Sequence, residues 1–210
     1  MDGIIFDVDG TLWDSTDEVA KSWNQVLREH TEIEPDLTAK RLEKEFGKPM
    51  EIIISNLFPE LGTQEKEKIV HLFYAYENEA MKTAPCRIYP GMKETVKKLS
   101  EKHELFIVSN CQAGYIEAFL ENTGLSSYFT DYTCPGDTGV LKAENIQIIM
   151  DRNKIRKAVY VGDTQGDADA CREAGIPMIY ASYGFGEVAD PGITIRSLSE
   201  LLDLDYEEIE

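Results

Sequence analysis

The stretch Gly3-Ile4-Ile5-Phe6-Asp7-Val8-Asp9-Gly10-Thr11 decides how the rest of the chain is interpreted. Its apolar residues run without alternation, which is typical of a strand buried on both faces of an α/β sheet. Asp7 and Asp9 follow at the carboxyl end of that strand, where open α/β sheets bind ligands. Two carboxylates so close repel each other and are costly to desolvate unless a cation or a proton shares the site. The stretch therefore indicates a metal site at the edge of a sheet.

The same stretch has two other interpretations. Asp9-Gly10 is a common turn dipeptide, so the strand could simply end in a hairpin corner. The oxygen-bearing side chains from Asp7 to Glu18 also fit positions one, three, five and twelve of a calcium-binding loop. The sixth position of such a loop requires glycine, however, and here it is Leu12. The rest of the chain has to distinguish these possibilities.

The composition limits the partners of the protein. The chain has 210 residues, of which 42% are hydrophobic, so one domain or a domain with an insertion can bury a real core. Lys and Arg total 21 against 39 Asp and Glu, which gives a formal net charge of -18. A surface this acidic repels nucleic acids and anionic membranes, so we expect neither as a partner.

The cysteines and the amino terminus indicate a cytoplasmic protein. Cys86, Cys111, Cys134 and Cys171 are scattered without a C-x-x-C pair, as expected of free thiols in a reducing compartment. The first residues already read as a strand, and we find no signal peptide or membrane span.

Residues 15–85 have helical periodicity throughout. Ser15 and Glu18 have the spacing of a capping box and predict a helix to about His30. Further helices are predicted from Pro35 to about Gly47, from Pro49 through Leu57, and over 63–81. Four consecutive helices add no strand to the sheet, so we expect a helical cap domain at 15–85 inserted into a core of 1–14 and 86–210.

From residue 89 onward helices and apolar strands alternate. Strands are expected at 105–108, near 129–132, at 158–161, at 177–180 and, more weakly, near 193–195. The fold class is therefore α/β, with a Rossmann-like, mostly parallel sheet that carries helices on both faces.

Polar groups follow three of the predicted strands. Asp7 and Asp9 follow the first, Ser109-Asn110 a middle one and Asp163 a later one. Parallel strands present their carboxyl ends at the same edge, so these groups can meet in one crevice. Together with Lys142 and Asp167 they suit a divalent cation and a phosphate.

At these residues the chain closely resembles the haloacid dehalogenase-like hydrolase superfamily. Residues 7–11 match its first motif, Ser109-Asn110 the second, Lys142 the third, and Gly162-Asp163-Thr164 with Asp167 the fourth. The insertion resembles the helical cap of the phosphoglycolate phosphatase and β-phosphoglucomutase branch. One departure is Ala143, since relatives often have proline after the lysine of the third motif.

The resemblance implies a catalytic pair and a metal site. Asp7 would be the nucleophile that forms an aspartyl-phosphate, and Asp9 would protonate the leaving oxygen and later activate water. Mg²⁺ would be held by the Asp7 carboxylate, the backbone carbonyl of Asp9 and the Asp163 carboxylate. Asp167 would support this site directly or through water.

The resemblance also implies binding residues for the phosphoryl group. Ser109, Asn110 and Lys142 would contact its oxygens. Taken singly, Ser109 and Asn110 could instead cap a helix, and Lys142 could lie at the surface. Lys48 lies in a loop between two cap helices that reaches into the site of capped relatives, so it is a possible substrate contact. A solvated lysine is the alternative interpretation.

The expected function is a Mg²⁺-dependent phosphatase that acts on a small phosphorylated metabolite. A phosphosugar mutase of the β-phosphoglucomutase type is the alternative, although Thr11 modestly favours the phosphatase. A receiver-like phosphoacceptor domain or a noncatalytic relative is disfavoured by the insertion and by the retained set of site residues. No pattern in the sequence identifies the metabolite or the oligomeric state.

Overall fold

The computed structural model describes residues 1–209. Its strands are β1 (Gly3–Phe6), β2 (Trp13–Asp14), β3 (Arg87–Ile88), β4 (Glu104–Val108), β5 (Asp131–Thr133), β6 (Ala158–Gly162), β7 (Met178–Ala181) and β8 (Ile193–Ile195). Its helices are α1 (Thr16–His30), α2 (Ala39–Leu42), α3 (Met50–Leu57), α4 (Thr63–Met81), α5 (Met92–Ser100), α6 (Tyr115–Thr123), α7 (Pro135–Thr138), α8 (Lys142–Asn153) and α9 (Gln165–Ala174). Short 3₁₀ helices are η1 (Ser126–Tyr128) and η2 (Leu198–Asp203).

A six-stranded parallel sheet in the order β5-β4-β1-β6-β7-β8 forms the centre of the fold. The strand β1 lies between β4 and β6, so both of its edges are hydrogen-bonded. Its residues are buried on both faces of the sheet, because helices cover each side. This arrangement explains the continuous apolar pattern and confirms the predicted α/β class.

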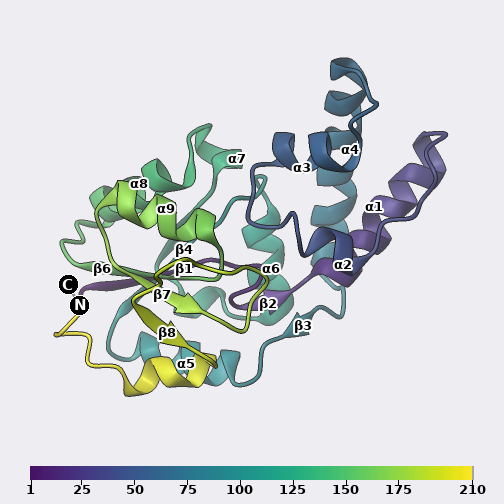
Figure 1. Ribbon diagram of the computed structural model, residues 1–210. Helices are drawn as coiled ribbons and strands as arrows, with labels where there is room; N and C mark the ends of the chain where they lie inside the picture. The colour runs from purple at the N-terminus through teal and green to yellow at the C-terminus, as the bar shows by residue number, and fades with distance from the viewer. Residues whose placement is uncertain (210) are drawn as a thin grey trace.

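The two faces of the sheet have separate hydrophobic cores. Ile5 packs in the core that α8 and α9 cover, with Ile146 among its members. Ile4 and Phe6 point the other way, into the core that includes Val96 of α5 and Ile116 of α6. Figure 1 shows α8 and α9 on one side of the strands and α5 and η2 on the other.

The helices α1 to α4 form one continuous insertion between β2 and β3, and Figure 1 shows them to one side of the sheet. Trp23 of α1 stacks on Phe73 of α4 with ring centroids 4.5 Å apart and planes 2° from parallel, which joins the two longest helices. The short strands β2 and β3 pair antiparallel, so the chain enters and leaves the insertion side by side. The boundary between a core and a cap domain stays a prediction. No helix within residues 1–209 has both the length and the apolarity to cross a membrane.

The second helix of the insertion is much shorter than predicted. It was expected from Pro35 to Gly47, but α2 covers only Ala39–Leu42. The Asn24 side chain accepts a hydrogen bond from the Leu37 amide and donates one to the Leu37 carbonyl. These bonds hold residue 37 against α1 and outside a helix, so α2 begins only after Thr38, whose hydroxyl accepts from the Arg41 amide.

The predicted capping box at Ser15 is also wrong. Ser15 precedes α1, but its side chain makes no capping hydrogen bond. Asp14 takes that role, because its carboxylate accepts from the Thr16 amide at 3.0 Å and from the Thr16 hydroxyl at 2.6 Å. The Ser15 hydroxyl is therefore free to bind elsewhere, and it does so at the candidate site.

Candidate active site

The predicted strand-end groups do converge. Asp7, Ser109 and Asp163 directly follow β1, β4 and β6, which are neighbours in the sheet. All three side chains are buried, with exposed fractions of 2%, 5% and 0%. Because the three strands are parallel, the groups lie at one edge, as the sequence predicted.

The Asp163 carboxylate is held by two hydrogen bonds and by a close backbone turn. The Phe185 amide donates to its Oδ2 at 2.7 Å, and the Thr11 hydroxyl donates to its Oδ1 at 3.3 Å. Gly10 has a φ of 82°, and a Cβ on it would lie 2.1 Å from Asp163 Oδ2. Only glycine allows this turn to approach the carboxylate so closely.

Lys142, at the start of α8, is buried between two carboxylates. Its Nζ lies 2.6 Å from Asp167 Oδ1 and 3.3 Å from Asp7 Oδ1. Burial by itself lowers the pKa of Lys142, but the charges of Asp167 and Asp7 outweigh it and raise that pKa above its ordinary value. The site therefore has a permanent positive charge beside Asp7.

Asp167 accepts four hydrogen bonds. Its Oδ1 accepts from Lys142, and its Oδ2 accepts from the Asp163 amide and from the amide and hydroxyl of Thr164. Two carboxylate oxygens ordinarily accept about four such bonds. Asp167 thus orients Lys142 and the start of α9, while its Oδ1, which accepts only from Lys142, keeps acceptor capacity toward the neighbouring carboxylates.

The carboxylates of Asp7, Asp163 and Asp167 form a group that fits a divalent cation. One oxygen from each lies within 4.8 Å of the others. Burial raises the pKa of Asp7 to about 6 against the opposing effects of Lys142 and Ser109, and burial with the neighbouring carboxylates raises the pKa of Asp163. Asp7 Oδ1 is buried without a well-aligned hydrogen bond. Oxygen donors short of positive charge suit Mg²⁺.

The Asp9 carboxyl lies outside that group and has a different environment. Its Oδ1 accepts from the Ser15 hydroxyl at 2.5 Å and from the Tyr115 hydroxyl at 2.9 Å. Burial raises the pKa of Asp9 to about 7, and these two hydrogen bonds oppose the rise. An aspartate with such a pKa can exchange a proton near neutral pH.

Ser15 and Tyr115 are site residues that the sequence analysis missed. Ser15 was assigned to a helix cap, and nothing in the local pattern distinguishes Tyr115 from other apolar positions of α6. A weak signal existed, because α6 directly follows the Ser109-Asn110 motif and its first turn had to lie near the crevice.

A small cavity of about 40 Å³ lies over Asp7 and Asp9, and Ser109 and Asn110 line it. The Asn110 side-chain amide donates to the Gly47 carbonyl at 2.9 Å, so it links the edge of the sheet to the insertion. Its predicted contact with a phosphoryl group stays a prediction.

Lys48 also lines this cavity, from the loop before α3. Its Nζ donates to the Lys44 carbonyl at 2.8 Å and to Glu45 Oε2 at 2.9 Å, and 41% of its side chain is exposed. The lysine is at the mouth of the site but is paired with Glu45, so its role as a substrate contact also stays a prediction.

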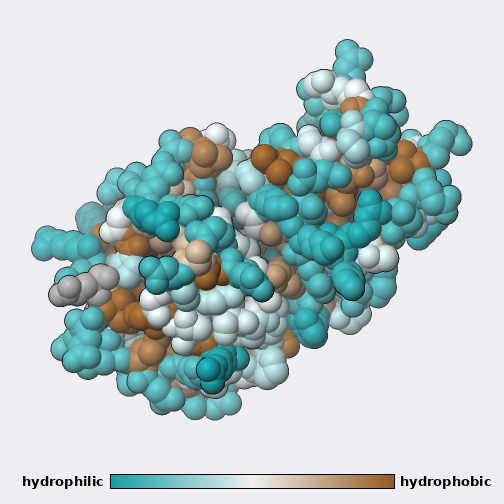
Figure 2. Space-filling model, in the orientation of Figure 1, coloured by the Kyte–Doolittle hydropathy of each residue, from teal (hydrophilic) through white to brown (hydrophobic). Residues whose placement is uncertain are grey.

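A larger cleft of about 320 Å³ opens beside the small cavity and shares Lys48, Asn110 and Cys111 with it. It lies between α3 and the segment from α7 to α8. Ile52 and Leu141, the two exposed large hydrophobic residues within 1–209, are on these segments, and Figure 2 shows hydrophobic surface on both sides of the hollow. The cleft therefore adjoins the small cavity over Asp7 and Asp9 at these shared residues.

A buried polar cluster near the site also escaped the sequence analysis. Glu77 of α4 is 5% exposed, and it accepts hydrogen bonds from Trp23 Nε1 at 2.6 Å and from Gln112 Nε2 at 3.1 Å. Burial raises the pKa of Glu77 to about 7. A charged residue on a helix usually faces water, so its burial follows only from the contact of α4 with the segment after β4.

Comparison with known proteins places these observations in a family. The model of the haloacid dehalogenase-like hydrolase family matches residues 4–181. A phosphoglycolate phosphatase of Vibrio vulnificus is 28% identical, with 96% of this chain and 94% of the relative aligned. A phosphoglycolate phosphatase of Aquifex aeolicus is 29% identical, with 96% and 95% aligned.

Solved structures have the same fold. A haloacid dehalogenase-like hydrolase of Streptococcus pneumoniae superimposes with a TM-score of 0.83 at 22% identity, covering 97% of each chain. CbbY of Rhodobacter sphaeroides, solved in complex with phosphate, superimposes with a TM-score of 0.78 at 17% identity, covering 97% of this chain and 100% of that one.

Proposed function

We propose an activity for this chain, which belongs to the haloacid dehalogenase-like hydrolase family. The proposed activity is the Mg²⁺-dependent hydrolysis of a small phosphomonoester through an aspartyl-phosphate on Asp7. Relatives named phosphoglycolate phosphatase support a phosphatase. They do not by themselves identify the substrate.

One observation carries the proposal: Asp7 Oδ1 is buried and weakly hydrogen-bonded, beside Lys142 and a group of carboxylates. A carboxylate that is not tied up by strong hydrogen bonds keeps a lone pair for attack on phosphorus. Lys142, beside Asp7, can bind an oxygen of the phosphoryl group, and Ser109 lines the small cavity over Asp7. These donors would stabilise the charge that develops on the phosphoryl oxygens.

The proposed metal site consists of the Asp7 and Asp163 carboxylates and the backbone carbonyl of Asp9. Mg²⁺ bound there would neutralise charge between Asp7 and the anionic substrate and hold the phosphoryl group in place. Asp167 would support this site directly or through water, and its hydrogen bonds also hold Lys142 and the start of α9.

In the first step Asp7 attacks phosphorus while the bond to the leaving oxygen breaks. The proton of the Asp9 carboxyl goes to that oxygen, so the leaving group departs as an alcohol while the phosphoryl group stays on Asp7. In the second step water attacks the aspartyl-phosphate and Asp9 accepts its proton. The bond between phosphorus and Asp7 breaks, which releases inorganic phosphate and restores both aspartates.

We further propose that residues 15–85 act as a cap over a core of 1–14 and 86–210. Hydrogen bonds join the two parts near the site, and include those from Gln112 to Glu77 and from Asn110 to Gly47. Closure of such a cap would exclude water during the first step and allow the product to leave afterwards. Lys48 would then meet the substrate from the cap side.

The proposed substrate is a small phosphorylated metabolite, and the proposed location is the cytoplasm. The small cavity over Asp7 and the cleft beside it offer room for a small substrate. All four cysteines are free, which agrees with a reducing compartment.

The test is phosphate release from a broad panel of phosphorylated metabolites, including phosphoglycolate and hexose phosphates, with and without Mg²⁺. We expect release that requires the metal and ranks the substrates. Interconversion of a hexose phosphate without net release would instead support a phosphosugar mutase. Absence of both activities from a folded protein would overturn the proposal.

A further inference from the structure

Within residues 1–209, the Asp9 carboxyl accepts two side-chain hydrogen bonds, and the same oxygen accepts both. Ser15 Oγ and Tyr115 Oη both donate to Asp9 Oδ1, and the two hydroxyl oxygens lie 2.9 Å from each other. Asp9 Oδ2 receives neither. The carboxyl group is therefore held asymmetrically, with one oxygen fixed and the other free.

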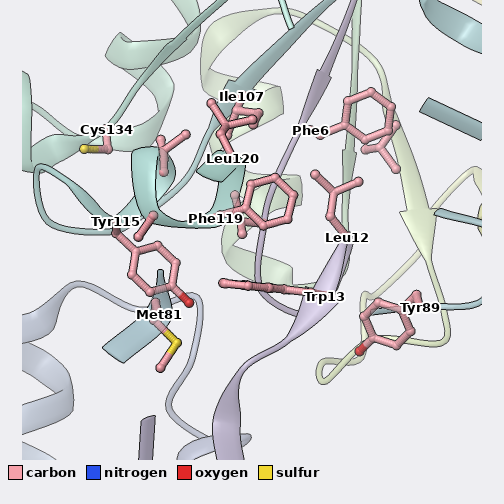
Figure 3. Close-up of a cluster of buried hydrophobic side chains, with 14 of the residues drawn as sticks. Phe6, Leu12, Trp13, Met81, Tyr89, Ile107, Tyr115, Phe119, Leu120 and Cys134 are labelled. Carbon is pink, nitrogen blue, oxygen red and sulfur yellow. The ribbon is translucent and has the colours of Figure 1, made fainter. Parts of the chain in front are cut away.

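Tyr115 is rigidly placed for this contact. It begins α6, and its side chain is 1% exposed. Its ring packs edge-to-face on Trp13, with centroids 6.2 Å apart and planes at 71°. Figure 3 shows the ring near Trp13, with its hydroxyl at the end away from α6. The packing fixes the ring, so the hydroxyl stays in one position relative to Asp9.

The unequal hydrogen bonding of the two Asp9 oxygens determines which of them can carry a proton. An oxygen that accepts two hydrogen bonds is a poor site for a proton of its own, because that proton would compete with the two donors. A protonated Asp9 therefore carries its proton on Oδ2. The two hydroxyls thus select the oxygen that carries the proton.

We propose that Tyr115, together with Ser15, is a positioning residue that fixes the Asp9 carboxyl so that Oδ2 delivers the proton to the leaving oxygen. This inference rests on the proposed phosphatase reaction. During transfer the Oδ2–H bond breaks, the O–H bond of the product alcohol forms, and Asp9 is left as a carboxylate that Ser15 and Tyr115 stabilise through Oδ1.

The inference separates two kinds of substrate. The leaving group of an aliphatic phosphomonoester departs as an alcohol, so its departure needs the proton of Asp9. The leaving group of acetyl phosphate is acetate and that of p-nitrophenyl phosphate is a stable phenolate. Neither of these two leaving groups needs a proton. A residue that only supports the fold would affect the two kinds equally, whereas one that positions the acid affects the first kind alone.

The experiment compares kcat/KM of the wild type and Tyr115→Phe on three compounds. These are the aliphatic phosphomonoester that ranks first in the panel, acetyl phosphate and p-nitrophenyl phosphate. The ratio kcat/KM reports the steps up to departure of the leaving group, so the shared hydrolysis of the aspartyl-phosphate does not enter it. We expect a loss of about 10-fold or more on the aliphatic ester, since general acids contribute about 10²–10⁴-fold, and a loss within about 2-fold on the other two.

Two further variants complete the design. Ser15→Ala removes the other donor to the same oxygen and should give the same substrate pattern. Tyr206→Phe removes a buried hydroxyl that donates to the Leu201 carbonyl, away from the site, and should leave all three rates unchanged. Thermal unfolding of each variant checks that it is folded.

Three results would overturn the inference. Equal losses on all three compounds in folded Tyr115→Phe and Ser15→Ala would give Tyr115 a structural role only. An unchanged rate on the aliphatic ester would remove the role altogether. Wild-type activity on acetyl phosphate and p-nitrophenyl phosphate alone would mean that Asp9 delivers no proton. Wild-type protein without phosphate release from any compound would instead overturn the proposed function itself.

Discussion

Four aspartates at the site have the same chemistry but different environments. Asp7 keeps a buried oxygen without an aligned hydrogen bond, whereas Asp167 accepts four hydrogen bonds. Asp163 lies against the turn at Gly10, and Asp9 contacts two hydroxyls. These differences assign a separate proposed role to each residue: nucleophile, support, metal ligand and acid.

Asp7→Asn tests the nucleophile. We expect phosphate release to fall by about three orders of magnitude or more, because the amide cannot form the covalent intermediate. Burial raises the pKa of Asp7 to about 6, so the charged form is disfavoured in the fold and the neutral amide should not lower the melting temperature at pH 8. Asp169→Asn, at an exposed ion pair with Arg172, is the control. Substantial residual turnover would remove the assignment.

Asp163→Ala tests the metal site. Removal of one proposed ligand should raise the Mg²⁺ concentration for half-maximal phosphate release by about 10-fold or more, because ligands and their partners set metal affinity. Asp151→Ala replaces an exposed aspartate of α8 and should leave the titration unchanged. An unaltered Mg²⁺ titration in Asp163→Ala would refute the proposed ligand set.

At the level of elements, α4 provides a polar link between the insertion and the rest of the molecule. Glu77 contacts Gln112 after β4 and Trp23 on α1. Asn78, the next residue, donates to the Ala113 carbonyl at 2.8 Å and accepts from Gln112 at 2.9 Å. The link therefore combines one buried carboxyl with neutral amides, and only the carboxyl changes with pH.

Glu77 makes the stability of the protein depend on pH. Its pKa rises from 4.5 to about 7 on folding because burial disfavours the charge. The folded state holds a proton that the unfolded state releases, so the free energy of unfolding falls as pH rises from about 4.5 to about 7. Relative to Glu77→Gln, the wild type should lose about 2–3 kcal/mol over this range in chemical denaturation.

The control for this measurement is Glu79→Gln, because Glu79 is exposed on the same helix and pairs with Lys82. That variant should keep the pH dependence of the wild type. An identical pH dependence in the wild type and Glu77→Gln would contradict the buried, protonated state of Glu77.

At the level of the whole molecule, the formal net charge of -18 opposes the approach of an anionic substrate. Salt screens this repulsion, since the Debye length falls from about 30 Å at 0.01 M to about 8 Å at 0.15 M. With saturating Mg²⁺, kcat/KM for phosphate release should therefore rise about 2–5-fold over that range of KCl, while kcat changes little. A steady fall in kcat/KM would show that local positive charge, from Lys142 and Lys48, dominates the encounter.

Much of the fold could be predicted because it depends on local patterns. The run Ile4-Ile5-Phe6 indicates burial on both faces, and the structure confirms β1 in the middle of a parallel sheet. The long helix over 63–81 was predicted with its observed bounds. The shortened α2 was missed, because its start depends on the Asn24 side chain, which is on another helix.

The α/β class, the family and the group of strand-end residues could be inferred before folding was considered, because each follows from neighbouring residues or from ordered motifs. The tertiary structure alone decided which groups each site residue contacts. Ser15 and Tyr115 are 100 positions apart and meet at Asp9, and Asn110 reaches Gly47 across 63 positions. Such contacts depend on the packing of separate elements, and a hydroxyl or an amide has no periodicity that reveals its partner before the chain has folded.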